Sequence, residues 1–148
     1  MNVFFDTSIW IDHFRHDILS SLLPLARQRY LLWTDPVVIA EIMAGCRSRR
    51  ERREAQAFAS GFGTRIASTG YADFIRAAEA ISKLREKGVT LKSPGSSLMD
   101  ALIAVDVRKI GALLVTHNLA DFQRLRAYIP LTVESLDDFR RRLWSTRS

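Results

Sequence analysis

The chain has 148 residues, of which 47% are hydrophobic and 26% charged, an ordinary composition for one globular domain. Its formal charge is +6 and 18 of its 22 cations are arginines, which excludes an acidic disordered chain and favours an anionic partner such as nucleic acid. Cys46 is the single cysteine, and no apolar run approaches the roughly 20 residues that a membrane helix needs. The N-terminus lacks the basic segment of a signal peptide, so we expect a soluble, cytoplasmic protein without membrane contact.

In the first half of the chain, apolar runs that predict strands alternate with segments that predict helices. Asn2–Phe5 has the pattern of a buried strand and leads to Asp6, after which Thr7 and Ser8 can cap a helix. The sequence then predicts a helix over about 18–28, a strand over 31–33, a helix from Asp35-Pro36 to Gly45, and a helix-compatible, arginine-rich stretch over 47–59.

The second half continues the alternation. Tyr71–Lys87 is amphipathic and followed by Gly88, and the apolar run Ala112–Thr116 is the clearest strand signal in the chain. The remaining elements are a loop over 92–95, a helix from Ser96 or Ser97 to Ile110, a helix over 118–126, a strand over 131–133 and a helix over 136–144. Together they predict one domain over residues 1–148, an α/β sandwich with a mostly parallel central sheet.

Several acidic residues follow strands or interrupt apolar helices. Asp6 comes after the first strand and Asp121 after the Ala112–Thr116 strand, where parallel sheets bind ligands. Glu41 and Asp100 lie within apolar helical segments, and a carboxylate buried there without a partner would be costly. A divalent cation would justify all four acids, because Mg²⁺ and Mn²⁺ prefer carboxylate oxygens and water.

A purely structural interpretation of these acids is also open. The S-x-x-D motif at 97–100 and the N-x-x-D motif at 118–121 both resemble capping boxes. Asp6 could neutralise the first turn of its helix, and Glu41 could pair with a buried arginine. The two interpretations are compatible, because a helix N-terminus favours the ionised carboxylate that a metal requires.

Residues 47–54, with the sequence RSRRERRE, carry five arginines and two glutamates. They could form a solvated helix face with i,i+4 ion pairs, or an RNA-phosphate contact surface through Arg47, Arg49 and Arg50. The three histidines are not spaced as a zinc site, although His117 lies beside the proposed acidic site and could touch a substrate.

Three segments of the chain carry a family resemblance. The segments VFFDTSIWID, PVVIAEIMAG and SLMDALIAVDVRKIGALLVTHNLADF resemble the PIN-domain ribonucleases, above all the VapC toxins of bacterial toxin–antitoxin pairs. The resemblance extends from Asn2 to about Glu134. It implies a PIN-like three-layer α/β/α sandwich and an endoribonuclease that depends on Mg²⁺ or Mn²⁺.

The resemblance also implies roles for particular residues. Carried over position by position, the four acids of the family's site are Asp6, Glu41, Asp100 and Asp121, which would bind the metal and catalyse hydrolysis. Supporting polar positions are Thr7, Thr116 and Asn118. Asp106 stays outside this set, because six residues after Asp100 it projects from a different side of the helix.

The partners that the resemblance implies are an RNA substrate, a VapB-like antitoxin that blocks the site, a second copy of the chain in a homodimer, and operator DNA bound through the antitoxin complex. Two alternatives stay open. The chain could be a housekeeping PIN nuclease for RNA processing without an antitoxin, or a catalytically silent PIN domain that binds RNA. Intact acids at all four positions argue against the silent domain.

Overall fold

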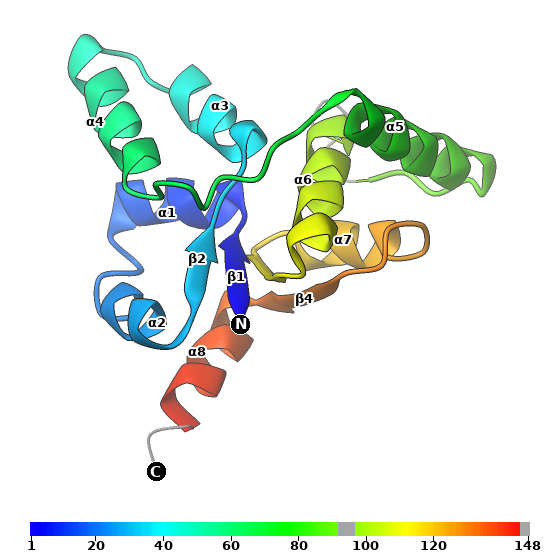
Figure 1. Cartoon of the computed structure of the whole chain (residues 1–148). Coiled ribbons are helices and arrows are strands. Elements are labelled where there is room, and N and C mark those ends of the chain that lie inside the picture. Colours follow the sequence, from blue (N-terminus) through cyan, green and yellow to red (C-terminus); the bar gives the residue numbers. More distant parts are fainter. Residues whose placement is uncertain (92–96, 146–148) are drawn as a thin grey trace.

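Four parallel strands form the centre of the molecule, in the order β2-β1-β3-β4 (Figure 1). They are β1 (Asn2–Phe5), β2 (Leu31–Trp33), β3 (Leu113–Thr116) and β4 (Thr132–Ser135). The computed structural model describes residues 1–91 and 97–145, and the loop predicted over 92–95 lies outside them. Because the strands are parallel, the residues that follow β1 and β3 emerge at the same edge of the sheet.

Helices cover both faces of the sheet, which confirms the predicted α/β sandwich (Figure 1). One side carries α1 (Thr7–His16), α2 (Leu23–Arg29) and α8 (Leu136–Ser145), and the other carries α5 (Tyr71–Glu86), α6 (Ser97–Ile110) and α7 (Leu119–Leu125). Two further helices, α3 (Pro36–Ala44) and α4 (Arg49–Ser60), lie beyond the carboxyl ends of β1 and β2. Within the described residues, no helix is both long and apolar enough to span a bilayer.

Burial of the sheet on both faces explains why the strand sequences are continuous apolar runs. All four residues of β3 are buried, since helices cover the sheet on both sides. The Phe5 ring makes edge contacts with Trp10 of α1 and Phe139 of α8, at centroid distances of 5.4 and 5.5 Å. These contacts fix α1 against β1 and thereby orient the residues at the start of α1.

Several predicted boundaries differ from the structure by one or more residues, and three of them are informative. The cap of α1 is Asp6 itself, whose side chain accepts a hydrogen bond from the Thr7 amide, so the prediction of Thr7 or Ser8 was wrong. Helix α2 begins only at Leu23, because Pro24 fits the first helical turn and not the interior. Strand β4 begins one residue later than predicted, at Thr132, and extends to Ser135.

Candidate metal centre

The structure brings the four predicted acids to the carboxyl edge of the sheet. Asp6 directly follows β1 and caps α1, Asp121 lies on α7 just after β3, Glu41 lies on α3, and Asp100 lies in the first turn of α6. Asp6, Asp100 and Asp121 are buried and Glu41 is half-buried. Residues 21 to 115 positions apart in sequence thus meet, because the parallel topology brings the carboxyl ends of the strands to the same edge.

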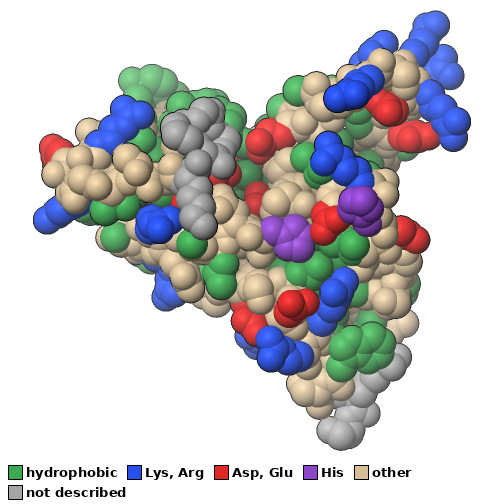
Figure 2. Space-filling model, turned by 180° about the vertical axis from the view of Figure 1, so that it is seen from behind, with side chains coloured by type: hydrophobic (Ala, Val, Ile, Leu, Met, Phe, Trp, Pro, Cys, Tyr) green, Lys and Arg blue, Asp and Glu red, His purple; other side chains and the backbone are tan. Residues whose placement is uncertain are grey.

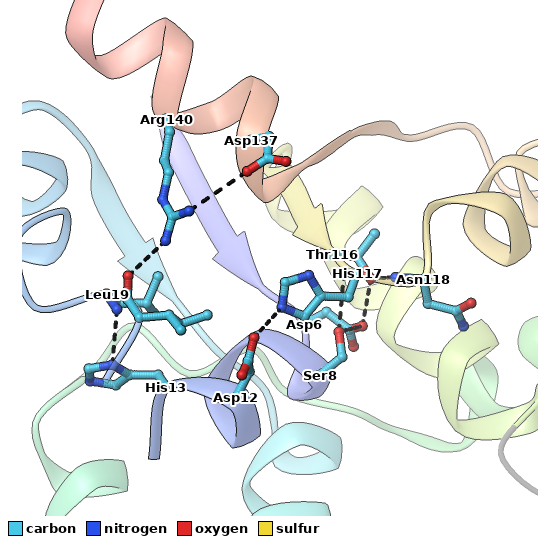
Figure 3. Close-up of polar contacts among 11 residues, drawn as sticks. Asp6, Ser8, Asp12, His13, Leu19, Thr116, His117, Asn118, Asp137 and Arg140 are labelled. Carbon is cyan, nitrogen blue, oxygen red and sulfur yellow. Dashed lines mark hydrogen bonds and ion pairs between the residues drawn. The ribbon is translucent and has the colours of Figure 1, made fainter. Parts of the chain in front are cut away.

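Asp6 is held by donors from two elements (Figure 3). Its Oδ1 accepts the Thr7 amide at 2.7 Å, and its Oδ2 accepts the hydroxyls of Thr116 at 2.7 Å and Ser8 at 2.9 Å. Thr116 in turn accepts the Asn118 amide at 2.8 Å. The carboxylate is therefore fixed in one orientation between β1 and β3. The sequence analysis missed the contact of Ser8, although its spacing of two residues from a capping aspartate could have indicated it.

Glu41 is linked to the same network through Thr7. The Thr7 hydroxyl donates to Glu41 Oε1 at 2.8 Å, so the predicted supporting role of Thr7 has a physical basis in this contact. The alternative partner, a buried arginine, is not what Glu41 Oε1 contacts. One threonine therefore joins α1 to α3.

Asn118 links the other two acids. Its side-chain amide donates to Asp100 Oδ2 at 3.3 Å and to Asp121 Oδ2 at 3.1 Å, and it makes no side-chain cap bond to α7. The capping-box interpretation of residues 118–121 is therefore wrong. Arg124, which the sequence analysis did not single out, donates to Asp121 Oδ1 at 2.9 Å across one helical turn. Asp121 thus has a cationic neighbour that the other three acids do not show among these contacts.

Burial and mutual repulsion disfavour the ionised form of these acids. Burial and then the charges of Asp6, Glu41 and Asp121 raise the pKa of Asp100 to about 8. Burial also raises the pKa of Asp6, against the opposing hydrogen bonds from Thr116, Ser8 and Thr7. Burial and the Asp6 charge raise the pKa of Glu41. The site concentrates negative charge that a cation would offset.

The donor set fits a hard divalent cation. Within residues 1–91 and 97–145, no three His, Cys, Asp or Glu side chains lie close enough together to hold an ion as they stand. Hydroxyl and amide donors from Thr7, Ser8, Thr116 and Asn118 instead bind the carboxylate oxygens. All four acids supply oxygen, which suits Mg²⁺ or Mn²⁺ and not zinc. The raised pKa of Asp100 fits this cation, because ionisation there requires a positive charge.

A second pair of carboxyl groups, Asp35 and Asp106, is fully buried behind the site. Asp35 caps α3 by accepting the Val38 amide at 2.8 Å through Oδ1, whereas Oδ2 accepts no hydrogen bond from the residues that the structure describes. Asp106 on α6 contacts Asp35, accepts the Thr69 hydroxyl at 2.5 Å and lies 3.2 Å from the Lys109 ammonium. The pair connects the helix of Glu41 to the helix of Asp100. Sequence analysis correctly predicted the Asp35 cap but not this contact.

Most of the arginine-rich stretch forms helix α4, which projects from the body of the molecule (Figures 1 and 2). Arg47, Arg49 and Arg50 are exposed, and Arg50 pairs with Glu54 at 3.1 Å in the i,i+4 arrangement predicted for a solvated face. Figure 2 shows the basic side chains gathered at the tip of this projection. A role for them in RNA binding stays a prediction.

Comparisons with solved structures show the same fold. A chain of VapBC2 from Rickettsia felis, bound to a DNA fragment from its promoter, matches at 24% identity with a TM-score of 0.67, over 93% of this chain and 100% of that one. VapBC-1 from nontypeable Haemophilus influenzae matches at 17% identity and TM-score 0.66, over 91% and 98%. DNA-bound VapBC from Salmonella typhimurium matches at 21% and 0.64, again over 91% and 98%.

At the level of sequence, a search among curated proteins gave no significant match. The PIN-domain family model, however, matches residues 3–128, from the second residue of β1 to the end of α7 and three residues beyond it. The matched segment contains Asp6, Glu41, Asp100 and Asp121. With the parallel sheet and the acids at its carboxyl edge, this match shows that the chain belongs to the PIN-domain family.

Proposed function

We propose that this chain is a divalent-metal-dependent endoribonuclease that acts in the cytoplasm as the toxin of a toxin–antitoxin pair. The observation that carries the proposal is the position of Asp100, buried among the charges of Asp6, Glu41 and Asp121 at the carboxyl edge of a parallel sheet. Such an arrangement is unfavourable for folding alone and favourable for binding a cation. Membership of the PIN-domain family supports a nuclease.

In this proposal, Asp6, Glu41, Asp100 and Asp121 hold Mg²⁺ or Mn²⁺. The bound ion supplies a water of lowered pKa and offsets charge on the leaving 3′ oxygen. Thr116, Ser8 and the Thr7 amide fix the Asp6 carboxylate, and Asn118 spaces Asp100 from Asp121. Water, and not the RNA 2′-hydroxyl or a protein side chain, would attack the phosphorus, and the 3′ oxygen would leave, so the products would carry 5′-phosphate and 3′-hydroxyl ends.

The comparisons favour a toxin over a housekeeping RNA-processing nuclease. All three similar structures are VapBC complexes, and the Rickettsia and Salmonella complexes are bound to DNA. We therefore propose a VapB-like antitoxin as partner, with operator DNA bound through the complex. Exposed apolar side chains on α5, among them Tyr71, Phe74 and Ile75, offer a surface for the proposed homodimer. A short reading frame overlapping the start of this one would support the toxin.

Replacing Asp6 tests the proposed activity. Asp6→Asn keeps the size of the side chain but removes its charge. Loss of a residue that only supports a metal ligand costs up to about 100-fold in activity, so loss of a ligand charge should reduce RNA cleavage in Mg²⁺ or Mn²⁺ by more than about 100-fold. Mapping of RNA 5′ ends after induced expression measures the effect. Asp17→Asn, an exposed aspartate after α1, is the matched control and should cleave like the wild type. Full activity of Asp6→Asn with an intact fold would refute the site.

Charge reversal on α4 tests the predicted RNA contact. Arg49→Glu with Arg50→Glu should weaken RNA binding and reduce the slope of log K against log salt by about 1.4, since each phosphate contact on a single strand contributes about 0.7. Lys87→Glu, a reversal at the exposed end of α5, should leave the slope nearly unchanged. An unaltered slope in the double variant would instead favour a solvated face with ion pairs alone.

A further inference from the structure

The turn between β3 and α7 separates the acidic site from a hollow of about 220 Å³. Thr116 and Asn118 direct their side chains to the acids, whereas His117 between them lines the hollow (Figure 3). Thr116 also forms part of the wall of the hollow, and its hydroxyl lies 2.7 Å from Asp6 Oδ2. A group bound in the hollow would therefore be separated from the acidic site by the Thr116 side chain.

The hollow has an apolar wall and a polar rim. Ile18, Leu119 and Leu136 supply the apolar wall, from the chain after α1, from α7 and from α8. Asp12 and Asp137 supply carboxylates to the rim, with 33% and 80% of their side chains exposed. A flat ring can pack against the apolar wall while its edge reaches these acceptors.

The two nitrogen-bearing side chains of the hollow, His117 and Arg140, already have carboxylate or carbonyl partners. His117 Nε2 lies 2.9 Å from Asp12 Oδ2, and Arg140 donates to the Ile18 carbonyl at 2.9 Å and lies 3.7 Å from Asp137 (Figure 3). A phosphate would have to displace these contacts and approach two carboxylates. A ring that carries N–H donors would gain acceptors there, so a nucleobase suits the hollow better than a phosphate does.

We propose that this hollow is a subsite for one unpaired RNA base that carries an amino group, on a nucleotide next to the phosphate at the acidic site. The proposal rests on the proposed function, because the RNA chain must pass over the turn between β3 and α7 to reach from the acids to the hollow. Adenine, guanine and cytosine carry an exocyclic amino group that donates to a carboxylate, and uracil does not. Asp137, which is the more exposed acid, is the principal acceptor.

Binding of mononucleotides tests the subsite without cleavage. CMP and UMP share phosphate, ribose and ring size but differ in the amino group. The metal-free wild type should bind CMP about fivefold more tightly than UMP, because discrimination between bases by about 1 kcal/mol corresponds to a fivefold ratio of affinities. Amide NMR shifts of His117, Leu119 and Ser135 report occupancy of the hollow. Asp137→Asn should abolish the preference. Asp138→Asn, which neutralises the next residue on α8 but does not line the hollow, should keep it. Equal affinity for CMP and UMP, or shifts confined to other residues, would overturn the proposal.

Cleavage of a randomised single-stranded RNA pool distinguishes the subsite from the nuclease activity itself. Wild type should cut beside amino-bearing bases in preference to uracil. Leu119→Trp, which fills the hollow, should raise KM about tenfold with little change in kcat, whereas Ala120→Trp on the exposed side of α7 should not. Cleavage without base preference would refute the subsite and leave the nuclease standing. Absence of cleavage by the wild type would refute the nuclease, and the CMP and UMP titration would then decide the subsite.

Discussion

Asp100→Asn should raise the stability of the metal-free protein and abolish its cleavage of RNA. Asp100 is 8% exposed, and burial together with three neighbouring carboxylates raises its pKa to about 8. The folded chain keeps this proton at pH 7, whereas the unfolded chain loses it above about pH 4. Each pH unit between these values lowers the free energy of unfolding by about 1.4 kcal/mol. An amide carries no such cost and still accepts a hydrogen bond from Asn118. We expect a gain of the order of 2–4 kcal/mol in the free energy of unfolding at pH 7, measured by urea denaturation in EDTA.

The same variant should lose its response to metal. Saturation of the wild type at about 100 times Kd should add about 2.7 kcal/mol to its stability, because the ion binds only the folded chain. Asp100→Asn should gain much less from Mg²⁺ or Mn²⁺, since a ligand charge is missing. Asp138→Asn, an exposed aspartate paired with Arg141 at 2.8 Å, is the control and should respond like the wild type. Equal stabilisation of Asp100→Asn and wild type by metal would contradict the assigned ligands.

The sheet and its acids could be predicted because each depends on a short, continuous segment of the sequence. A continuous apolar run at Ala112–Thr116 indicates a strand buried on both faces, and an acid that follows such a run must lie at the carboxyl edge. Parallel topology then brings Asp6 and Asp121 together without knowledge of any side-chain contact. Glu41 and Asp100 were identifiable because a charge inside an apolar helix needs a partner.

Contacts between side chains of distant segments could not be predicted in the same way. Spacing of three residues fits both a capping box and the observed amide bridge from Asn118 to Asp121, and only the orientation of the turn after β3 decides between them. Arg124 pairs with Asp121 at i,i+3, a spacing too common to indicate a site. Asp35 was fully explained as an N-cap, so nothing in its surroundings pointed to Asp106, which lies 71 positions later.

Asp35→Asn should flatten the dependence of stability on pH. Burial, contact with Asp106, and the charges of Asp106 and Glu41 raise the pKa of Asp35 to about 8, against the Val38 amide bond. A raised pKa means that the folded chain keeps a proton that the unfolded chain releases above about pH 4. This stabilisation is complete below pH 4, declines as pH rises, and is lost once pH passes about 8.

One shared proton accounts for this behaviour. Asp35 Oδ2 is buried and accepts no hydrogen bond from the described residues, and a proton on it would donate to Asp106. The Thr69 hydroxyl and the Lys109 ammonium already face Asp106, so we place the proton on Asp35. In Asp35→Asn the side-chain amide can donate to Asp106 at every pH. Relative to wild type, the variant should therefore gain up to about 1.4 kcal/mol per pH unit between pH 5 and 8.

Urea denaturation at pH 5, 6, 7 and 8 in EDTA measures this difference, and it separates a shared proton from simple packing. Asp35→Ala should be destabilised at every pH, because it loses the α3 cap and leaves Asp106 buried without its partner. Asp138→Asn should run parallel to wild type, since that carboxylate is exposed. A constant offset between Asp35→Asn and wild type across the range would mean that Asp35 is ionised in the folded protein. With both carboxylates ionised, the Lys109 ammonium would have to offset two negative charges. The repulsion between Asp35 and Asp106 would then weaken the contact between α3 and α6.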